Sequence, residues 1–133
     1  MKTKFVVKLS FLLMAAAFGC SSREIPPAPA GTVPLFEGLG DHHMPVTTSN
    51  AAAQQYFDQG IRLVYGFNHD EAERSFREAA RLDPNCAMTW WGVAYALGPN
   101  INLPLDAERN TRALDAVGRA RALLSHVSPK ERD

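Results

Sequence analysis

The pattern of apolar and polar positions changes near residue 50. From there to the end of the chain, apolar residues return every three to four positions, which is the spacing of amphipathic α-helices. The pattern predicts helices at 50–66, 69–82, 85–97 and 106–125, and the start of a further, truncated helix at 129–133. Because no strand pattern is apparent, the sequence predicts an all-α fold.

The helix predicted at 50–66 is apolar on two sides. These sides consist of Tyr56, Gly60, Leu63 and Phe67, and of Ala53, Phe57, Ile61 and Val64. A helix of this kind is normally covered on both sides by neighbours. Gly60 is expected to permit a close approach by the next helix, since it has no side chain. The helix at 85–97 is apolar nearly all round and is expected to end at Gly98–Pro99.

The two remaining helices have one apolar stripe each. These stripes are Ala72, Phe76 and Ala79 in the first, and Ala113, Val117, Ala120 and Leu124 in the second. Charged pairs such as Glu73–Arg77 and Asp115–Arg119 stand four positions apart, which predicts solvated outer faces. Asn68 is expected to cap the helix at 69–82. Asp83–Pro84 is expected to start the following helix, as its cap and first-turn proline.

Comparison of the chain with itself indicates two related hairpins. Tyr56, Gly60 and Leu63 recur 34 positions later as Trp90, Ala94 and Leu97. With the run Ala72, Phe76, Ala79 and with Pro84, this pattern resembles the tetratricopeptide repeat (TPR) family. Gln59 departs from it, since a leucine usually fills that position. The resemblance implies TPR-like helix-turn-helix repeats at 50–85 and, with a loop insertion, at 86–128, which would start a right-handed α-solenoid.

Two repeats leave an apolar end uncovered, and about three are normally needed for a stable array. We therefore expect the chain to be an N-terminal fragment of a longer TPR protein. The alternative is that a partner completes the array.

The N-terminus has the three-part layout of a secretory signal. A lysine-containing start precedes the apolar run Leu9–Phe18, and Gly19 then precedes Cys20. This arrangement resembles the bacterial lipobox, which implies a lipoprotein signal peptide at 1–19 and acylation of Cys20. The resemblance further implies a lipid-anchored protein of the bacterial cell envelope, on the outer membrane and facing the periplasm. The alternative is an ordinary signal peptide cut near Ala17.

The next two segments differ in their apolar content. Residues 20–34 contain four prolines and predict an extended, Pro-rich tether without regular structure. Residues 35–49 form an irregular segment with too many apolar side chains for a free linker, and we expect this segment to pack on the repeats. These side chains are Leu35, Phe36, Leu39, Met44 and Val46.

Composition excludes several functions. Fourteen basic residues balance fourteen acidic ones, and the charges are interleaved, so no nucleic-acid partner is expected. Only Cys20 and Cys86 could form a disulfide, and lipidation of Cys20 would leave Cys86 as a lone, buried thiol. A dyad of Cys86 with a histidine lacks any recognisable oxyanion donor. We therefore expect no enzymatic activity and no cofactor.

The TPR resemblance implies a scaffold that binds a protein or peptide partner in a groove. The groove positions of the family correspond here to Gln54, Phe57, Ile61, Met88, Trp91 and Tyr95. These positions lack the cations of a carboxylate clamp, whereas aromatic side chains and methionine suit a hydrophobic segment. The alternative is that residues 35–48 or missing repeats already cover them.

Two other functions remain open. His42 and His43, with Met44, His69, Cys86 and Met88 elsewhere in the chain, suggest a lipoprotein that binds a soft metal such as copper or zinc. Adjacent histidines alone do not define a metal site, so this is the weaker hypothesis. The chain could also be a structural cap for a catalytic region outside it.

Overall fold

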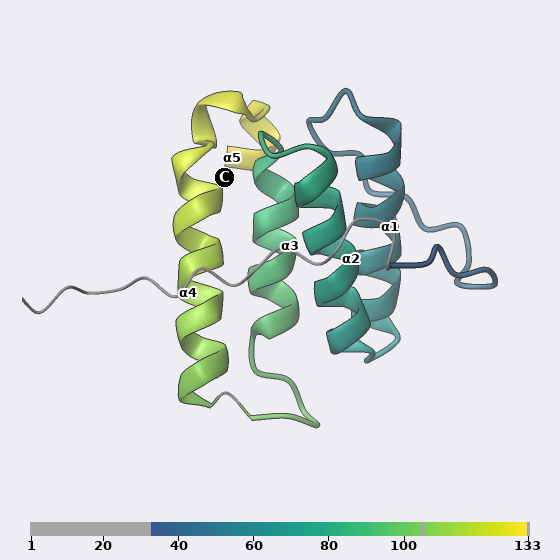
Figure 1. Ribbon diagram of the computed structural model, residues 1–133, viewed down its shortest axis with the longest axis vertical. Helices are drawn as coiled ribbons and strands as arrows, with labels where there is room; N and C mark the ends of the chain where they lie inside the picture. The colour runs from purple at the N-terminus through teal and green to yellow at the C-terminus, as the bar shows by residue number, and fades with distance from the viewer. Residues whose placement is uncertain (1–32, 105, 133) are drawn as a thin grey trace, which may run out of the picture.

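The computed structural model describes residues 33–104 and 106–132 (Figure 1). The predicted signal peptide, Cys20 and nearly all of the tether lie outside these residues. The elements are α1 (Ala51–Tyr65), α2 (His69–Leu82), α3 (Ala87–Leu97), α4 (Ala107–Ala122), the 3-10 turn η1 (Leu124–His126) and α5 (Pro129–Arg132). The described part contains no strand beyond an isolated bridge between Asn100 and Leu103, so the prediction of an all-α fold is confirmed.

The helices pack in consecutive pairs. Figure 1 shows α1, α2, α3 and α4 side by side in chain order, with a longer loop between α3 and α4 than between the other neighbours. Contacts join α1 to α2, α2 to α3 and α3 to α4, and α1 also touches α3. The α2–α3 contact joins the two pairs, so the four helices share one core.

Short polar side chains define where three of the helices begin. The Asn50 side chain accepts hydrogen bonds from the N–H groups of Ala52 and Ala53 at the start of α1. Asn68 caps α2 as predicted, accepting from the N–H of Glu71, and Asp106 caps α4. These caps satisfy backbone donors that have no partner inside the helix.

The predicted start of the third helix is wrong. Asp83 ends α2 instead of capping α3, Pro84 lies in the turn, and α3 begins at Ala87 after Cys86. The reason lies in the Asp83 carboxylate, which accepts a hydrogen bond from the N–H of Asn85 at 3.1 Å and another from the Thr48 hydroxyl at 2.5 Å. The aspartate thus closes the turn, a role that its side chain performs as readily as capping.

The centre of the core is the Phe76 ring of α2, which is fully buried. A Cβ placed on Gly60 of α1 would lie 2.6 Å from the ring's Cε1, and a Cβ placed on Gly92 of α3 would also lie 2.6 Å from that atom. The two glycines therefore let α1 and α3 approach Phe76 closely. Phe57 packs against the ring with centroids 5.4 Å apart.

The predicted outer faces are only partly solvated. Glu73, Ser75 and Glu78 of α2 are buried, and Glu73 forms ion pairs with both Arg77 and Arg112. The charged face of α2 is therefore partly covered by α4. The predicted inward stripe of α4 also needs correction, because Val117 and Leu124 are exposed whereas Ala116 is buried.

Residues 33–49, which we call the strap, run along α1 and are fixed to it by side chains of that helix. The Gln59 amide accepts from the N–H of Phe36 at 2.7 Å and donates to the Pro34 carbonyl at 2.9 Å. The Gln54 amide accepts from the N–H of Val46 at 3.0 Å and donates to the Met44 carbonyl at 2.9 Å. Gln59, which departs from the repeat pattern, thus holds the strap.

Candidate functional site

The six predicted groove residues divide into a covered and an open group. Phe57 and Ile61 of α1 belong to the core, with exposed fractions of 0% and 2%. Gln54 is half-buried and bonds the strap. These α1 positions therefore do not line an open groove in this structure, because the strap and the core take up their side chains.

The open group lies on α3. Trp91 is 39% exposed and Tyr95 is 44% exposed, and their rings stack with centroids 5.2 Å apart. Met88 lies one turn before Trp91 and is nearly buried. Of the predicted groove, only the face of α3 that contains Trp91 and Tyr95 is therefore open to solvent.

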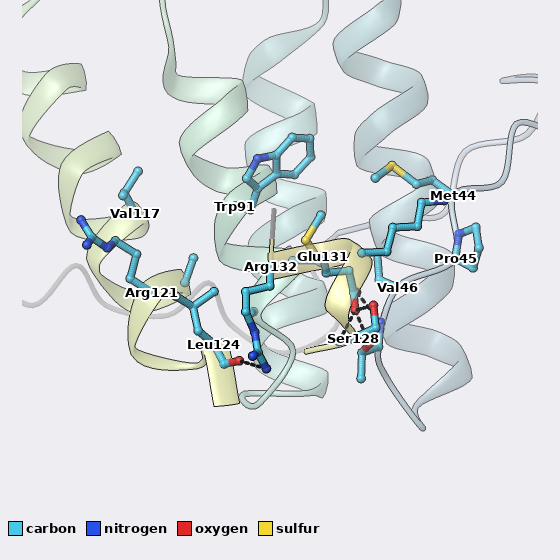
Figure 2. Close-up of a pocket in the computed structure, with 15 residues that line it drawn as sticks. Met44, Pro45, Val46, Trp91, Val117, Arg121, Leu124, Ser128, Glu131 and Arg132 are labelled. Atoms are coloured by element: carbon cyan, nitrogen blue, oxygen red, sulfur yellow. Dashed lines mark hydrogen bonds between the residues drawn. The ribbon is translucent and has the colours of Figure 1, made fainter. Parts of the chain in front are cut away.

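A cavity of about 810 Å³ opens beside this face. It lies between α3, α4, the strap and α5, and we call it the groove (Figure 2). Most of its lining is apolar and comes from Met44, Pro45, Val46, Ala87, Met88, Trp91, Val117, Ala120 and Leu124. The exposure of Val117 and Leu124, unexpected for an inward stripe, follows from their position in the groove wall.

The charged residues of the groove lining are three cations and one anion, namely Arg121, Lys130, Arg132 and Glu131. None of the three cations forms an ion pair within the described part of the chain. Figure 2 shows Arg121 beside Val117, and Arg132 extending toward Leu124, whose carbonyl accepts a 3.4 Å hydrogen bond from Arg132 Nη2. The groove is therefore apolar with positively charged side chains around it.

The anion, Glu131 of α5, forms hydrogen bonds with Thr47 and Ser128 of the same chain. Its carboxylate accepts hydrogen bonds from the N–H of Thr47 at 2.7 Å and from the N–H and hydroxyl of Ser128 at 2.9 Å and 2.6 Å. The Thr47 hydroxyl donates to it as well. Burial raises the pKa of Glu131, but the hydrogen bonds from Ser128 and Thr47 outweigh this, so the pKa lies below its ordinary value. We call these contacts the Glu131 bridge, which joins α5 to the strap.

No known protein family, curated protein or solved structure matches the chain. The groove and its charges must therefore be interpreted from their own chemistry. The helices of the described part include none that is both long and apolar enough to cross a membrane.

His42 and His43, the residues of the alternative metal hypothesis, lie in the strap and contact side chains of α1. His43 Nδ1 lies 2.7 Å from Asp58 Oδ2, and the same carboxylate accepts from the N–H of Met44 at 3.1 Å. The His42 ring makes an edge contact with Tyr65, with centroids 6.0 Å apart. Within residues 33–104 and 106–132, no three His, Cys, Asp or Glu side chains gather as metal ligands would.

Cys86 precedes α3 and is 1% exposed. Burial raises the pKa of its thiol, so the uncharged form is favoured at neutral pH. The side chain belongs to the core cluster with Phe76 and Leu97.

The repeat positions found by self-comparison lie mainly in the core. Leu63, Ala72, Phe76, Ala79 and Leu97 are buried, while Tyr56, Trp90 and Ala94 are partly buried against them. Pro84 is exposed in the α2–α3 turn.

Sequence reasoning missed the cations of the groove. Arg121 stands four positions after Val117 and therefore shares its helix face, which was a readable signal. Lys130 and Arg132 carry no such signal, because their place beside the groove depends on a contact between Thr47 and Glu131. That contact joins residues 84 positions apart in the sequence, and no local pattern indicates it.

Proposed function

We propose that this chain is a scaffold that binds a segment of another protein in the groove and has no catalytic role. The observation that carries the proposal is the solvent-exposed Trp91 in an apolar cavity of about 810 Å³. Cavities of this size are typical of ligand sites, which range over about 300–1,000 Å³. Aromatic residues and methionine are also enriched at the centres of protein interfaces.

The TPR resemblance supports the same proposal. Helices packed in consecutive pairs, with small and aromatic side chains at equivalent core positions, are compatible with two TPR-like hairpins at the start of a solenoid. A stacked array of this kind offers an extended binding surface.

The test is selection from a displayed library of random peptides on the immobilised full chain, followed by equilibrium binding of the selected peptides. Trp91→Ala is expected to weaken binding at least about tenfold, because an aromatic side chain at an interface centre commonly contributes about 2 kcal/mol or more. Tyr65→Ala is the matched control, since Tyr65 is a more exposed aromatic residue, 67% exposed, outside the groove lining. Peptides that bind both variants equally well would place the site elsewhere and overturn the proposal.

We further propose that Cys20 anchors the scaffold to the bacterial envelope as a lipoprotein, on the periplasmic side of the outer membrane. The proposal is supported by the signal-like sequence before Cys20, which lies outside the described residues. Several acyl chains would give firm anchorage, at about 0.8 kcal/mol for each buried methylene.

Labelling cells with a radioactive fatty acid tests this anchor. Cys20→Ala is expected to abolish incorporation and to release the protein from membranes, whereas Cys86→Ala should retain the label. Acylation that persists in Cys20→Ala would exclude the proposed site.

A further inference from the structure

From the charges around the groove we infer that its partner is an acidic peptide segment, in which Asp or Glu side chains flank a large apolar residue. The inference rests on the proposed function and adds the chemistry of the ligand. It depends on charge complementarity between that segment and Arg121, Lys130 and Arg132.

The charged residues of the groove lining are mainly positive. Its charged residues are three cations and Glu131. Since the Glu131 carboxylate is occupied by four hydrogen bonds from Thr47 and Ser128, it is not directed at a ligand. The Glu131 bridge also fixes α5, the helix that contains Lys130 and Arg132. The bridge therefore holds two of the cations beside the groove.

The positions of the cations favour a ligand with several carboxylates over a ligand with a single one. Arg121 belongs to α4, whereas Lys130 and Arg132 belong to α5, so the positive charge comes from two elements that border the groove. A single terminal carboxylate would satisfy only part of this arrangement. An extended segment with acidic side chains on both sides of an apolar residue could pair with both elements, and arginine forms strong, directional hydrogen bonds with carboxylates.

The apolar part of the groove sets the other half of the specificity. Trp91 and Met88 of α3 line the cavity together with Met44 and Val46 of the strap. This space suits a leucine or phenylalanine side chain, because burial of a large apolar side chain away from water is favourable. The apolar residue would provide affinity there, while the cations would select segments with acidic neighbours.

The closing experiment measures binding of the labelled, end-blocked peptide Glu-Asp-Leu-Phe-Asp-Glu to the full chain by fluorescence anisotropy. Its neutral counterpart replaces each Glu with Gln and each Asp with Asn. The acidic peptide is expected to bind at least about tenfold more tightly than the neutral one, since hydrogen bonds to charged groups are the strong ones. Its affinity should fall as salt rises, because these charges are exposed.

Variants of α4 locate the effect. Arg121→Gln is expected to weaken binding of the acidic peptide about tenfold and to leave the neutral peptide unchanged. Arg119→Gln removes the same charge from the same helix but outside the groove lining, where Arg119 pairs with Asp115 at 3.0 Å. This control should change binding of the acidic peptide little.

Each alternative result has a distinct meaning. Equal binding of the acidic and neutral peptides would overturn the inference and leave the proposed apolar peptide site intact. Tighter binding of decanoate, or of a neutral peptide with a free C-terminal carboxylate, would overturn the choice of an acidic segment. If none of the peptides binds at millimolar concentration, the inference fails, whereas the proposed function fails only if the library selection also yields no peptide that depends on Trp91.

Discussion

Replacing Gly92 with alanine tests the central packing of the fold. The added Cβ would lie 2.6 Å from Phe76 Cε1 and 2.7 Å from Phe76 Cγ, distances at which something must move. The ring has little room to shift, because it is fully buried and Gly60 of α1 approaches it just as closely, with its own added Cβ at 2.6 Å from Cε1. Overpacking of a core costs about 1–3 kcal/mol, and the enclosed ring places Gly92→Ala near the upper end of that range.

A second contribution acts in the opposite direction. Alanine is favoured over glycine inside a helix by about 1 kcal/mol, so the net destabilisation by Gly92→Ala should be about 2 kcal/mol. Gly118→Ala in α4 isolates this contribution, because nothing lies within 4 Å of its added Cβ. The free energy of unfolding of this control should rise by about 1 kcal/mol. The free energies of unfolding of the two variants should therefore differ by about 3 kcal/mol, although the chemical change is the same.

The assay is urea unfolding followed by far-ultraviolet circular dichroism, with linear extrapolation to water. Phe76→Leu completes a double-mutant cycle with Gly92→Ala, and a favourable coupling of about 1–2 kcal/mol is expected, since the smaller side chain makes room for the methyl group. Equal stability of Gly92→Ala and Gly118→Ala, or the absence of coupling to Phe76→Leu, would refute the packing described here.

Two further predictions concern titratable groups. The depressed pKa of Glu131 means that the stability contributed by its bridge is present above pH 4.5, its ordinary value, and is lost as the pH falls below it. The difference in unfolding free energy between the wild type and Thr47→Val should therefore shrink in acid, and a constant difference would contradict the bridge. In the Cys20→Ser variant, Cys86 should react with a disulfide reagent at least about 100-fold more slowly than in urea, because exposure requires an opening of about 3 kcal/mol. Since burial raises the pKa of its thiol above the ordinary 9.0, stability should fall as the pH rises beyond that value; rapid modification in native buffer would show that Cys86 is accessible.

The helices could be predicted because the signals that form them are local. Apolar residues at helical spacing located all four long helices, and Asn68 marked the start of α2 by its position alone. The start of α3 was misjudged because aspartate before proline is equally suited to a cap and to a turn. The deciding contact is the hydrogen bond from Thr48 to Asp83, two residues that are far apart in the sequence.

The faces of the helices were less predictable than the helices themselves. Charged residues on α2 indicated a solvated surface, but Glu73 is buried and forms ion pairs with Arg77 and Arg112. A charged side chain can be buried when it is paired, and periodicity within α2 does not reveal a partner on α4. For the same reason, Val117 was assigned to the interior, since an apolar side chain looks alike in a core and in a groove wall.

The sequence predicted the α3 residues of the groove but not its other walls, and the strap explains why. An α1 that is apolar on two sides needs cover, and the strap provides it with backbone groups that bond Gln54, Asp58 and Gln59. Buried polar side chains of this kind are tolerated because each has hydrogen-bond partners. The strap thereby removes the α1 positions from the expected groove and supplies Met44 and Val46 as a new wall on the other side of Trp91. The same segment also carries Thr47, which fixes α5, so the cover of the core, the shape of the groove and the placement of Lys130 and Arg132 all depend on one irregular stretch of chain.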